Sequence, residues 1–223
     1  MADSKQAPLD AEAAAKAAFA SVQDQPFPDD IFTAPELRWA VIGCGVIANQ
    51  MAQSLALAGR KLAGVANRTL SKAQSFAEQY GVEKVYETVE DLYADPDIDA
   101  VYITTPHNTH ITYLRAALAA GKHVLCEKAI TLNSAELDEA RAIADELNVV
   151  LMDATTVFHM PLYQELRRRM DAGDFGRMNL AQLNFGSYKE YGDLTNRFYN
   201  RNLAGGAMLD IGVYALSVMR LFM

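Results

Sequence analysis

Two short segments of the sequence concentrate side chains that can bind a ligand or move a proton, TTPHNTH at residues 104–110 and CEKA at residues 126–129. His107 and His110 in the first segment are spaced as one turn of a helix, a spacing that can hold a metal ion. No convincing set of further ligands accompanies them, so we expect no metal site and favour helix capping or contact with a substrate. The second segment places a carboxylate beside an ammonium group. These are Glu127 and Lys128.

Each segment follows an apolar run that is typical of a β-strand, and helical stretches alternate with such runs along the chain. This alternation predicts an α/β fold of the Rossmann type, a doubly wound parallel sheet covered by helices. Ligands bind beyond the carboxyl ends of the strands in such folds, so we expect the two segments to face one another there. The six candidate strands are WAVIG from Trp39, KLAGVAN from Lys61, VYE near Val85, AVYITT from Ala100, KHVLCE from Lys122 and VVLMDA from Val149.

The chain divides into three parts by composition. Residues 1–37 form an Ala-rich, then proline-containing arm or linker, expected either to embrace another subunit of a homo-oligomer or to be a leader without fixed structure. Residues 38–156 carry the alternation of strands and helices and are expected to form the Rossmann-type domain. Residues 157–223 are expected to begin an α+β domain with a mixed or antiparallel sheet, containing a helix at 161–172, a strand at 178–187 and a final apolar helix. Because the chain ends inside that apolar pattern, we expect it to be cut short.

A glycine-rich turn follows the first predicted strand, with Gly43, Gly45 and Ala48 in a G-x-G-x-x-A pattern. In this position the first glycine permits a tight turn, the second leaves room for a pyrophosphate, and the alanine lets the helix approach the sheet. The helix that begins at Val46 and Ile47 offers unpaired N–H groups to phosphates. The turn therefore predicts a dinucleotide site, the alternative being a close-packed turn that binds nothing.

The residues at the end of the second predicted strand indicate whether the adenosine ribose of the cofactor carries a free 2′-hydroxyl or a 2′-phosphate. A carboxylate is expected there if the ribose carries a free 2′-hydroxyl, but the chain reads Ala66, Asn67, Arg68. A guanidinium is suited to a phosphate, so Arg68 favours NADP over NAD. In the alternative interpretation Arg68 is a solvated loop residue and NAD binds through Asn67.

The loops after the fourth and fifth strands complete the predicted cofactor site. We expect the turn that precedes the histidines to line the nicotinamide ribose, because it leaves the carboxyl end of a strand. The expected cofactor-binding residues of the two loops are Thr104, Thr105, Pro106, His107, His110, Glu127 and Lys128.

The glycine turn, TPHNTH, CEKA and the later GGAMLDIGVY occur in this order over residues 38–223, and together they resemble the Gfo/Idh/MocA oxidoreductases. Members of that family usually carry Glu-Lys-Pro after the fifth strand, where this chain has Glu127, Lys128 and Ala129. The resemblance implies that Lys128 lies near the nicotinamide and the substrate hydroxyl. The loss of the proline removes a rigid element from this loop.

The same resemblance implies catalytic roles for Asp210 and Tyr214, whose i and i+4 spacing puts them on one helix face. In the tyrosine-bearing branch of the family, Tyr214 would be the proton donor or acceptor and Asp210 would orient Lys128 or the substrate. A phenol with a pKa of about 10 needs a neighbouring cation to act near neutral pH, and Lys128 would lower its pKa. Helical periodicity alone favours the alternative in which Lys128 and Asp210 form a structural salt bridge and Tyr214 is a core residue.

These inferences predict an NAD(P)-dependent oxidoreductase that prefers NADP, with NAD as the alternative cofactor. It would transfer hydride between the nicotinamide and a secondary alcohol or ketone of a sugar, polyol or dihydrodiol. The rival interpretation is a non-catalytic nucleotide-binding protein, or a fragment that binds the cofactor without turnover. Residues 188–201, rich in tyrosine and charged side chains, are expected either to line the substrate site or to be a solvated excursion.

Composition excludes several other classes of function. The 223 residues carry 20 Lys and Arg against 28 Asp and Glu, a net charge of −8 without a basic run, so nucleic acid is not an expected partner. Acidic residues interrupt the N-terminus, and no run reaches about 18 apolar residues, so we expect neither secretion nor membrane insertion. Cys44 and Cys126 lack the spacing of a disulfide framework or zinc site, which favours the cytoplasm.

Overall fold

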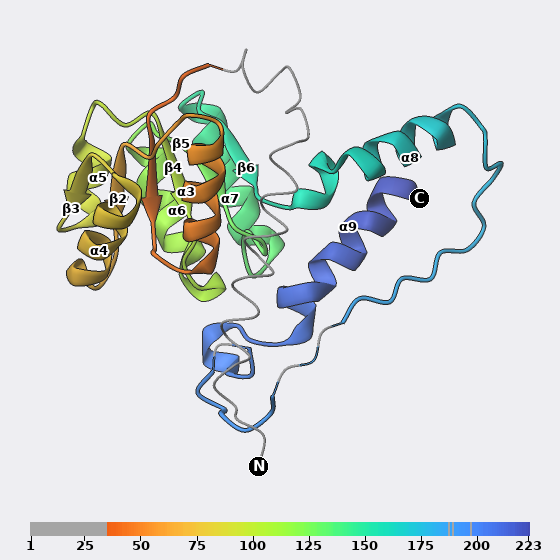
Figure 1. Ribbon diagram of the computed structural model, residues 1–223. Helices are drawn as coiled ribbons and strands as arrows, with labels where there is room; N and C mark the ends of the chain where they lie inside the picture. Colours follow the sequence, from red (N-terminus) through yellow and green to blue (C-terminus); the bar gives the residue numbers. More distant parts are fainter. Residues whose placement is uncertain (1–34, 187, 189, 197) are drawn as a thin grey trace.

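The computed structural model describes residues 35–223 apart from 187, 189 and 197. Residues 1–34, nearly all of the predicted arm, lie outside the described residues. The described chain contains one sheet of six parallel strands in the order β3-β2-β1-β4-β5-β6 (Figure 1). This order confirms the predicted doubly wound sheet and puts the change of direction between β1 and β4. The strands are β1 Trp39–Ile42, β2 Gly64–Ala66, β3 Lys84–Tyr86, β4 Ala100–Ile103, β5 His123–Cys126 and β6 Leu151–Asp153.

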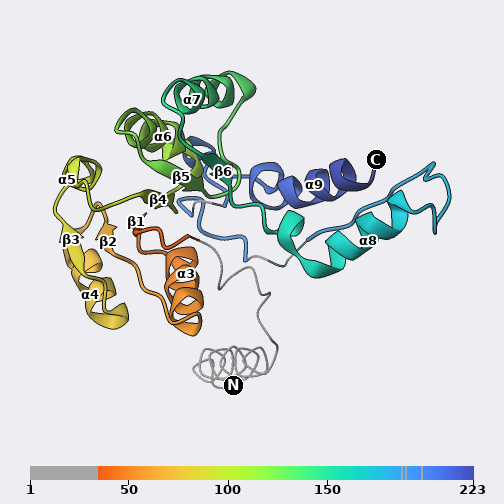
Figure 2. The same ribbon diagram turned by 90° about the horizontal axis from the view of Figure 1, so that it is seen from above.

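Helices cover both faces of the sheet (Figure 2). Successive residues of a strand point to opposite faces, so Ala40 and Ile42 of β1 join one apolar cluster while Val41 joins the other. The first cluster packs against α5, α6 and α7, and the second packs against α3 and α4. The helices are α3 Val46–Leu57, α4 Leu70–Tyr80, α5 Val89–Ala94, α6 His110–Ala119 and α7 Ser134–Glu146, with the 3-10 turn η1 at His107–Thr109.

Local chemistry sets where these helices begin and end. Asn133 precedes α7 and its side chain accepts a hydrogen bond of 3.0 Å from the backbone N–H of Glu136, which caps the helix. Gly81 ends α4 in the left-handed conformation with φ +64°, which a residue without a Cβ adopts without strain. The cap at Asn133 ends the loop after β5 that carries part of the candidate site, and Gly81 turns the chain from α4 toward the start of β3.

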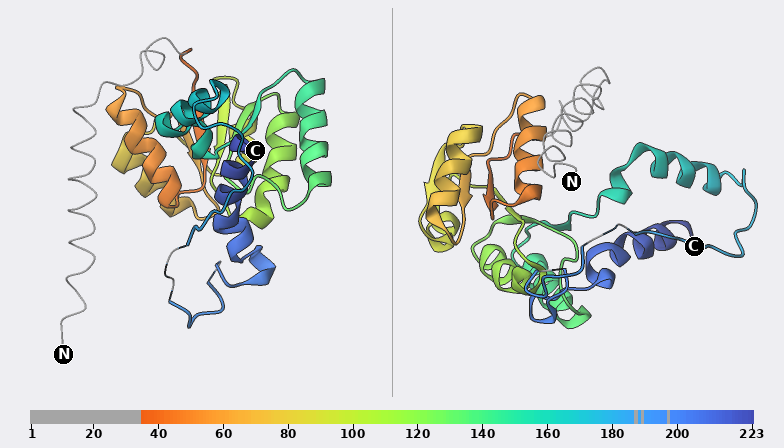
Figure 3. Two further views of the ribbon diagram at one scale, coloured as in Figure 1. Left: turned by 90° about the vertical axis from the view of Figure 1, so that its right-hand side faces the viewer. Right: turned by 60° about the horizontal axis from the view of Figure 1, so that its bottom comes forward.

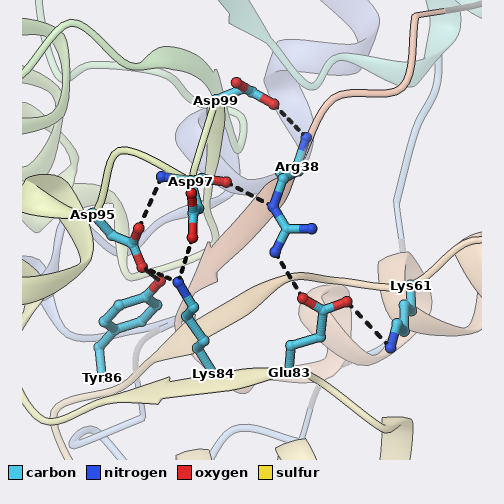
Figure 4. A network of polar contacts seen from close by, with 8 residues as sticks. All are labelled: Arg38, Lys61, Glu83, Lys84, Tyr86, Asp95, Asp97 and Asp99. Atoms are coloured by element: carbon cyan, nitrogen blue, oxygen red, sulfur yellow. Dashed lines mark hydrogen bonds and ion pairs between the residues drawn. The ribbon is translucent and has the colours of Figure 1, made fainter.

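The opposite, amino edge of the sheet carries a network of paired charges (Figure 4). Arg38 donates to Glu83 at 2.7 Å, and Lys84 pairs with both Asp95 at 2.7 Å and Asp97 at 3.0 Å. This network joins the residues that precede β1 and β4 to the start of β3 and thereby ties three strands together at one edge. Its members are Arg38, Lys61, Glu83, Lys84, Tyr86, Asp95, Asp97 and Asp99.

The residues after β6 leave the sheet and return to it. The predicted helix at 161–172 is α8, Pro161–Asp171, which follows the turn η2 at Thr156–His159. After η3 at Arg201–Leu203, the π-helical turn η4 at Met208–Gly212 leads into α9 at Val213–Phe222. Helices α8 and α9 lie side by side (Figures 1 and 2), where the Arg167 guanidinium donates to the Leu221 carbonyl at 2.6 Å.

The strand predicted at 178–187 is wrong for the described part of that segment. Residues 177–186 form an open trace without regular structure (Figure 3), and residue 187 lies outside the described residues. A strand needs a neighbour that accepts and donates its backbone hydrogen bonds. Among the described residues no other strand lies beside this segment, because all six belong to the Rossmann sheet.

One described segment, residues 201–222, is long and apolar enough by length and composition to cross a membrane, with a hydropathy of 1.3. Our expectation counted unbroken apolar residues and therefore passed over it. The segment contains Asp210, whose carboxylate lies 3.3 Å from the ammonium nitrogen of Lys128 in the Rossmann domain. This ion pair connects the segment to the loop after β5, and no residue of the segment is buried in the described structure.

Candidate active site

The glycine turn between β1 and α3 forms the centre of the carboxyl edge. Gly43 has φ +102°, and a Cβ built there would lie 2.7 Å from the Oγ1 of Thr104 in the loop after β4. Gly43 thus allows two loops to touch at the point where the strand order reverses. A Cβ at Gly45 would meet nothing within 4 Å among the residues that the structure describes, so Gly45 leaves space for a ligand there. Both glycines have the properties that the sequence pattern predicts for a phosphate turn.

The N-terminus of α3 is open to a ligand. Gly45 is its cap residue and, within the described part of the chain, no side chain caps the helix, so the N–H groups of its first turn are left for another acceptor. Val46 is 74% exposed and Ile47 37% exposed, whereas Ala48 is fully buried against the sheet. The alanine therefore does what the motif requires of its third position. The geometry fits the phosphates of a dinucleotide, and the predicted contacts of Val46 and Ile47 stay a prediction.

At the end of β2, the side chain of Asn67 donates to the carbonyl of Thr69 at 2.9 Å, which fixes the turn into α4. Arg68 beside it is exposed and takes part in no ion pair among the described residues. Residues 66–69, which end β2 and lead into α4, contain no carboxylate. The chemistry of the position therefore suits a phosphate better than a pair of ribose hydroxyls.

Sequence reasoning missed Lys72 in the first turn of α4. It lines an open groove of about 410 Å³ between the glycine turn, α3 and α4. The Lys72 charge also acts on Cys44, although burial outweighs it and raises the pKa of that thiol to about 11. The spacing Arg68-x-x-x-Lys72 at the start of a helix is the signal that could have found this residue. The groove is lined by Cys44, Asn49, Ser71, Lys72, Ser75, Phe76 and Gln79.

The loop after β4 is bound to its neighbours on both sides. The backbone N–H and the hydroxyl of Thr104 both donate to the carbonyl of Ile42, each at 3.0 Å. Thr109 donates to the hydroxyl of Thr105 at 2.9 Å, and Pro106 is exposed at the tip of the turn. These hydrogen bonds fix the backbone of the turn beside Gly43. A turn that is to line a nicotinamide ribose needs such a fixed backbone.

The two histidines point inward, toward the loop after β5. His107 Nε2 lies 2.9 Å from the carbonyl oxygen of Lys128, and His110 Nδ1 lies 2.9 Å from that of Ala129. His110 has no exposed surface, and its Nε2 lies 2.8 Å from the carbonyl oxygen of Thr105. In this arrangement a direct contact between the His110 side chain and a cofactor is closed off, because backbone groups surround the ring. Among the described residues no group of three or more His, Cys, Asp or Glu could hold a metal ion.

The three predicted catalytic residues come together. The Lys128 ammonium lies 3.3 Å from Asp210 Oδ1 and also donates to the carbonyl of Asp210. The same nitrogen lies 4.8 Å from the centre of the Tyr214 ring, over its face. The side chains of the pair are 14% and 19% exposed, so the contact is largely shielded from water. Residues 82 positions apart in the chain thus form one cluster beside the loop after β5.

The pKa of Tyr214 does not move in the direction that we expected. Burial raises it above the ordinary value, and the negative charges of Glu127 and Asp210 raise it further. Lys128 was expected to lower it, which is wrong for this arrangement because the ammonium pairs with Asp210 and lies over the ring rather than at the hydroxyl. Tyr214 is therefore a protonated phenol near neutral pH.

Glu127 is held by a neighbouring strand. The hydroxyl of Tyr102 on β4 donates to Glu127 Oε1, and the backbone N–H of Glu127 donates to the carbonyl of Ile103 at 3.0 Å. Burial is the main cause that raises the pKa of Tyr102, and the charge of Glu127 adds to it. These two contacts hold the Glu127 carboxylate at the carboxyl end of β5, next to Lys128.

The wall on the substrate side is sparse. A small cavity beside Asp210 lies between the turn at Pro106 and the turn at 203–206. Tyr188 is 90% exposed and Tyr191 74% exposed, so in the described structure these side chains are solvated, which is one of our two expectations for residues 188–201. Residues 189 and 197 lie outside the described residues.

Comparison with known protein families matches both parts of the chain. An oxidoreductase family with an NAD-binding Rossmann fold matches residues 37–155, and the GFO/IDH/MocA C-terminal domain matches residues 163–223. Among relatives, trans-1,2-dihydrobenzene-1,2-diol dehydrogenase of Mus musculus is 35% identical over 188 residues, which are 82% of this chain and 55% of the relative. The Homo sapiens protein of the same name is 35% identical over 81% of this chain and 54% of its own length. The chain therefore spans about half the length of the relatives it matches.

Solved structures give the same result. A 3-ketoreductase from Actinomadura kijaniata, in complex with NADP and TDP-benzene, is 31% identical with a TM-score of 0.71, over 84% of this chain and 57% of that one. An aldose-aldose oxidoreductase from Caulobacter crescentus, complexed with glycerol, is 26% identical with a TM-score of 0.71, over 84% and 58% of the two chains. With its glycine turn, its six-stranded parallel sheet and both family matches, this chain belongs to the Gfo/Idh/MocA oxidoreductase family and contains an NAD(P)-binding Rossmann domain.

Proposed function

We propose that this protein is an NADP-preferring oxidoreductase that interconverts a secondary alcohol and a ketone on a sugar, polyol or diol. The observation that carries the proposal is the meeting of Lys128, Asp210 and Tyr214 at the carboxyl edge of the sheet. This edge also holds the open glycine turn, so a cofactor seated on the turn and a substrate beside Tyr214 would be neighbours. Relatives and neighbouring structures named as dehydrogenases and ketoreductases support the same class of reaction.

The chemistry divides between cofactor and protein. A bound nicotinamide supplies or accepts the hydride, and the chain must supply or accept the proton of the alcohol. Tyr214, whose raised pKa keeps the phenol protonated, is in the form that donates a proton to a ketone oxygen. Lys128 adds a positive charge beside the developing alkoxide, and Asp210 holds that ammonium in place. This division favours ketone reduction near neutral pH.

The preference for NADP rests on two cations at the end of β2. Arg68 and Lys72 flank the start of α4, Lys72 lines the groove beside the glycine turn, and residues 66–69 contain no carboxylate that would repel a 2′-phosphate. A guanidinium and an ammonium with spare hydrogen-bond donors suit a dianionic phosphate. The structure of the 3-ketoreductase from Actinomadura kijaniata contains NADP, which supports this assignment for a relative with the same fold.

The experiment that tests the proposal is titration of the purified chain with NADPH and with NADH, followed by nicotinamide absorbance in the presence of sugars, polyols, diols and their ketones. We expect tighter binding of NADPH and oxidation of NADPH by at least one ketone. Binding without turnover would instead support a nucleotide-binding protein. Equal affinity for the two cofactors would contradict the NADP preference and leave the reaction class standing.

A further inference from the structure

The motif TPHNTH has a use in the structure that its spacing alone does not reveal. His107 and His110, three residues apart at the start of α6, contact the consecutive carbonyl oxygens of Lys128 and Ala129, each at 2.9 Å. Their rings meet edge to face with centres 5.6 Å apart. One helical turn thus contacts two successive peptide groups of the loop after β5. The backbone from which the Lys128 side chain projects is therefore held by histidines.

His110 links this loop to a second one. Its Nδ1 faces the Ala129 carbonyl, while its Nε2 lies 2.8 Å from the carbonyl of Thr105 in the turn after β4. Both partners can only accept hydrogen bonds, and a neutral imidazole has a single N–H to donate. Burial is the largest influence on this ring and lowers its pKa, against the backbone hydrogen bonds and the charge of Glu127. The neutral ring must therefore satisfy one carbonyl at a time.

We propose that His110 is the positioning residue of the candidate active site, donating from Nδ1 to the Ala129 carbonyl and so setting where the Lys128 ammonium meets Asp210 and Tyr214. The inference deepens the proposed function and rests on it for its effect on turnover. The geometric claim is independent of turnover, because the Lys128 contact can be measured directly. His110 touches neither cofactor nor substrate and acts through the backbone of the loop after β5.

The contacts of the two ring nitrogens of His110 can be separated by substitution. Asparagine can place an amide N–H near the position of Nδ1, and glutamine can place one near the position of Nε2. We therefore expect His110→Asn to keep the bond to the Ala129 carbonyl and His110→Gln to lose it. His123→Asn is the matched control, because His123 accepts a bond from the Val150 N–H at 3.0 Å at the opposite edge of the sheet.

The measurement is the rate at which an amine-acylating reagent modifies Lys128, followed by mass spectrometry of the peptide at low conversion. Loss of the ion pair in Asp210→Asn sets the upper reference. We expect His110→Gln to raise the rate at least threefold toward this reference, while His110→Asn and His123→Asn stay within twofold of wild type. Equal rates in the two His110 variants would overturn the proposal.

Turnover supplies the second readout. If the proposed function holds, His110→Gln should lower kcat about tenfold while the affinity for NADPH changes less than threefold, and His110→Asn should restore most of kcat. A wild-type chain that turns over no substrate would overturn the proposed function only, because the acylation rates still decide the position of Lys128. Unequal acylation without any difference in kcat would overturn the catalytic part of the inference.

A measurement on the unmodified chain covers the case in which the His110 variants do not fold. The nitrogen chemical shifts of a histidine distinguish the ring with its proton on Nδ1 from the ring with its proton on Nε2. We expect His110 to carry its proton on Nδ1, toward Ala129. A proton on Nε2 would bind the ring to Thr105 instead and would overturn the proposal.

Discussion

The two edges of the Rossmann sheet use charge in opposite ways. At the amino edge Arg38 lies 2.7 Å from Glu83, and Lys84 lies 2.7 Å from Asp95 and 3.0 Å from Asp97 (Figure 4). At the carboxyl edge Arg68 and Lys72 take part in no ion pair among the described residues, and the first turn of α3 lacks a side-chain cap. The charges of the amino edge pair with one another, whereas at the carboxyl edge Lys128 pairs with Asp210 and the two cations Arg68 and Lys72 are left for a ligand.

This difference separates structural from functional polar groups within one sheet. The pKa of Asp95 lies far below its ordinary value because Lys84 and Tyr86 donate hydrogen bonds to it. The pKa of Tyr214 lies above its ordinary value because burial and two nearby carboxylates oppose its ionisation. The hydrogen-bond donors around Asp95 stabilise its charged form. Tyr214, whose surroundings oppose ionisation, keeps a proton that it can donate. Four predictions, which use six substitutions, test whether the two edges are as different as this.

The largest effect is expected at the carboxyl edge, in Tyr214→Phe. Removal of the hydroxyl should lower kcat about 10²- to 10³-fold, because a positioned proton donor contributes on this scale. The affinity for NADPH should stay within threefold of wild type, as measured by fluorescence titration. The exposed Tyr191→Phe is the control and should leave kcat unchanged. An active Tyr214→Phe would remove this tyrosine from the reaction.

Two glycines of one turn should respond in opposite ways to the same substitution. Gly43→Ala forces a Cβ within 2.7 Å of Thr104 Oγ1 at φ +102°, so we expect the free energy of unfolding to fall by about 2 kcal/mol. The Cβ of Gly45→Ala meets no atom of the described residues within 4 Å, and the backbone there is extended, so stability should hold while NADPH affinity falls at least tenfold. Denaturant melts and titrations compare the pair. Undiminished affinity in Gly45→Ala would contradict a phosphate site at the turn.

A smaller effect is expected for the two cations at the end of β2. Arg68→Ala and Lys72→Ala should each weaken NADPH binding about tenfold, or about 1.4 kcal/mol, and change NADH binding much less. Lys61→Ala at the amino edge is the control, because Lys61 pairs with Glu83 at 3.2 Å. An unchanged ratio of NADPH to NADH affinity in both variants would show that these cations contact no 2′-phosphate.

The smallest effect is expected at the amino edge. Asp95→Asn should lower Tm by about 2–4 °C at pH 7 and leave NADPH affinity unchanged. Because the pKa of Asp95 is lower in the folded than in the unfolded chain, its stabilisation is full well above about pH 3.9 and is lost as the pH falls toward the folded value. The difference in Tm between wild type and variant should therefore shrink below about pH 4. A difference that grows in acid would reverse the assignment.

The Rossmann domain could be predicted because its signals are local. The strands from Trp39 to Asp153 are short apolar runs, and Gly43, Gly45 and Ala48 stand directly after the first of them. The strand expected at 178–187 failed because a strand depends on a neighbour, which the pattern of one segment does not contain. A sequence pattern predicts a strand correctly where the strands that pair with it lie in the same part of the chain and show the same pattern.

The candidate site was harder to predict than the fold. The cluster of Lys128, Asp210 and Tyr214 came from resemblance, because no spacing relates residues 82 positions apart. Lys72 was missed because its approach to the glycine turn depends on how α4 packs beside α3. The direction of the Tyr214 pKa was wrong because it depends on burial and on two carboxylates that only the folded chain brings near. Each of these quantities belongs to tertiary structure.

The contact between Lys128 and Asp210 has a consequence for the order of events during folding. It closes a loop of 82 residues, whereas the contacts within each strand-helix unit span far fewer. Contacts of such long range form late, since their entropic cost is met only after local structure exists. We therefore expect refolding chains to regain affinity for NADPH before they regain turnover, which stopped-flow fluorescence and delayed activity assays would resolve. In this order of events the Rossmann domain folds first. The cluster of Lys128, Asp210 and Tyr214 forms later, when residues 208–222 pack against that domain.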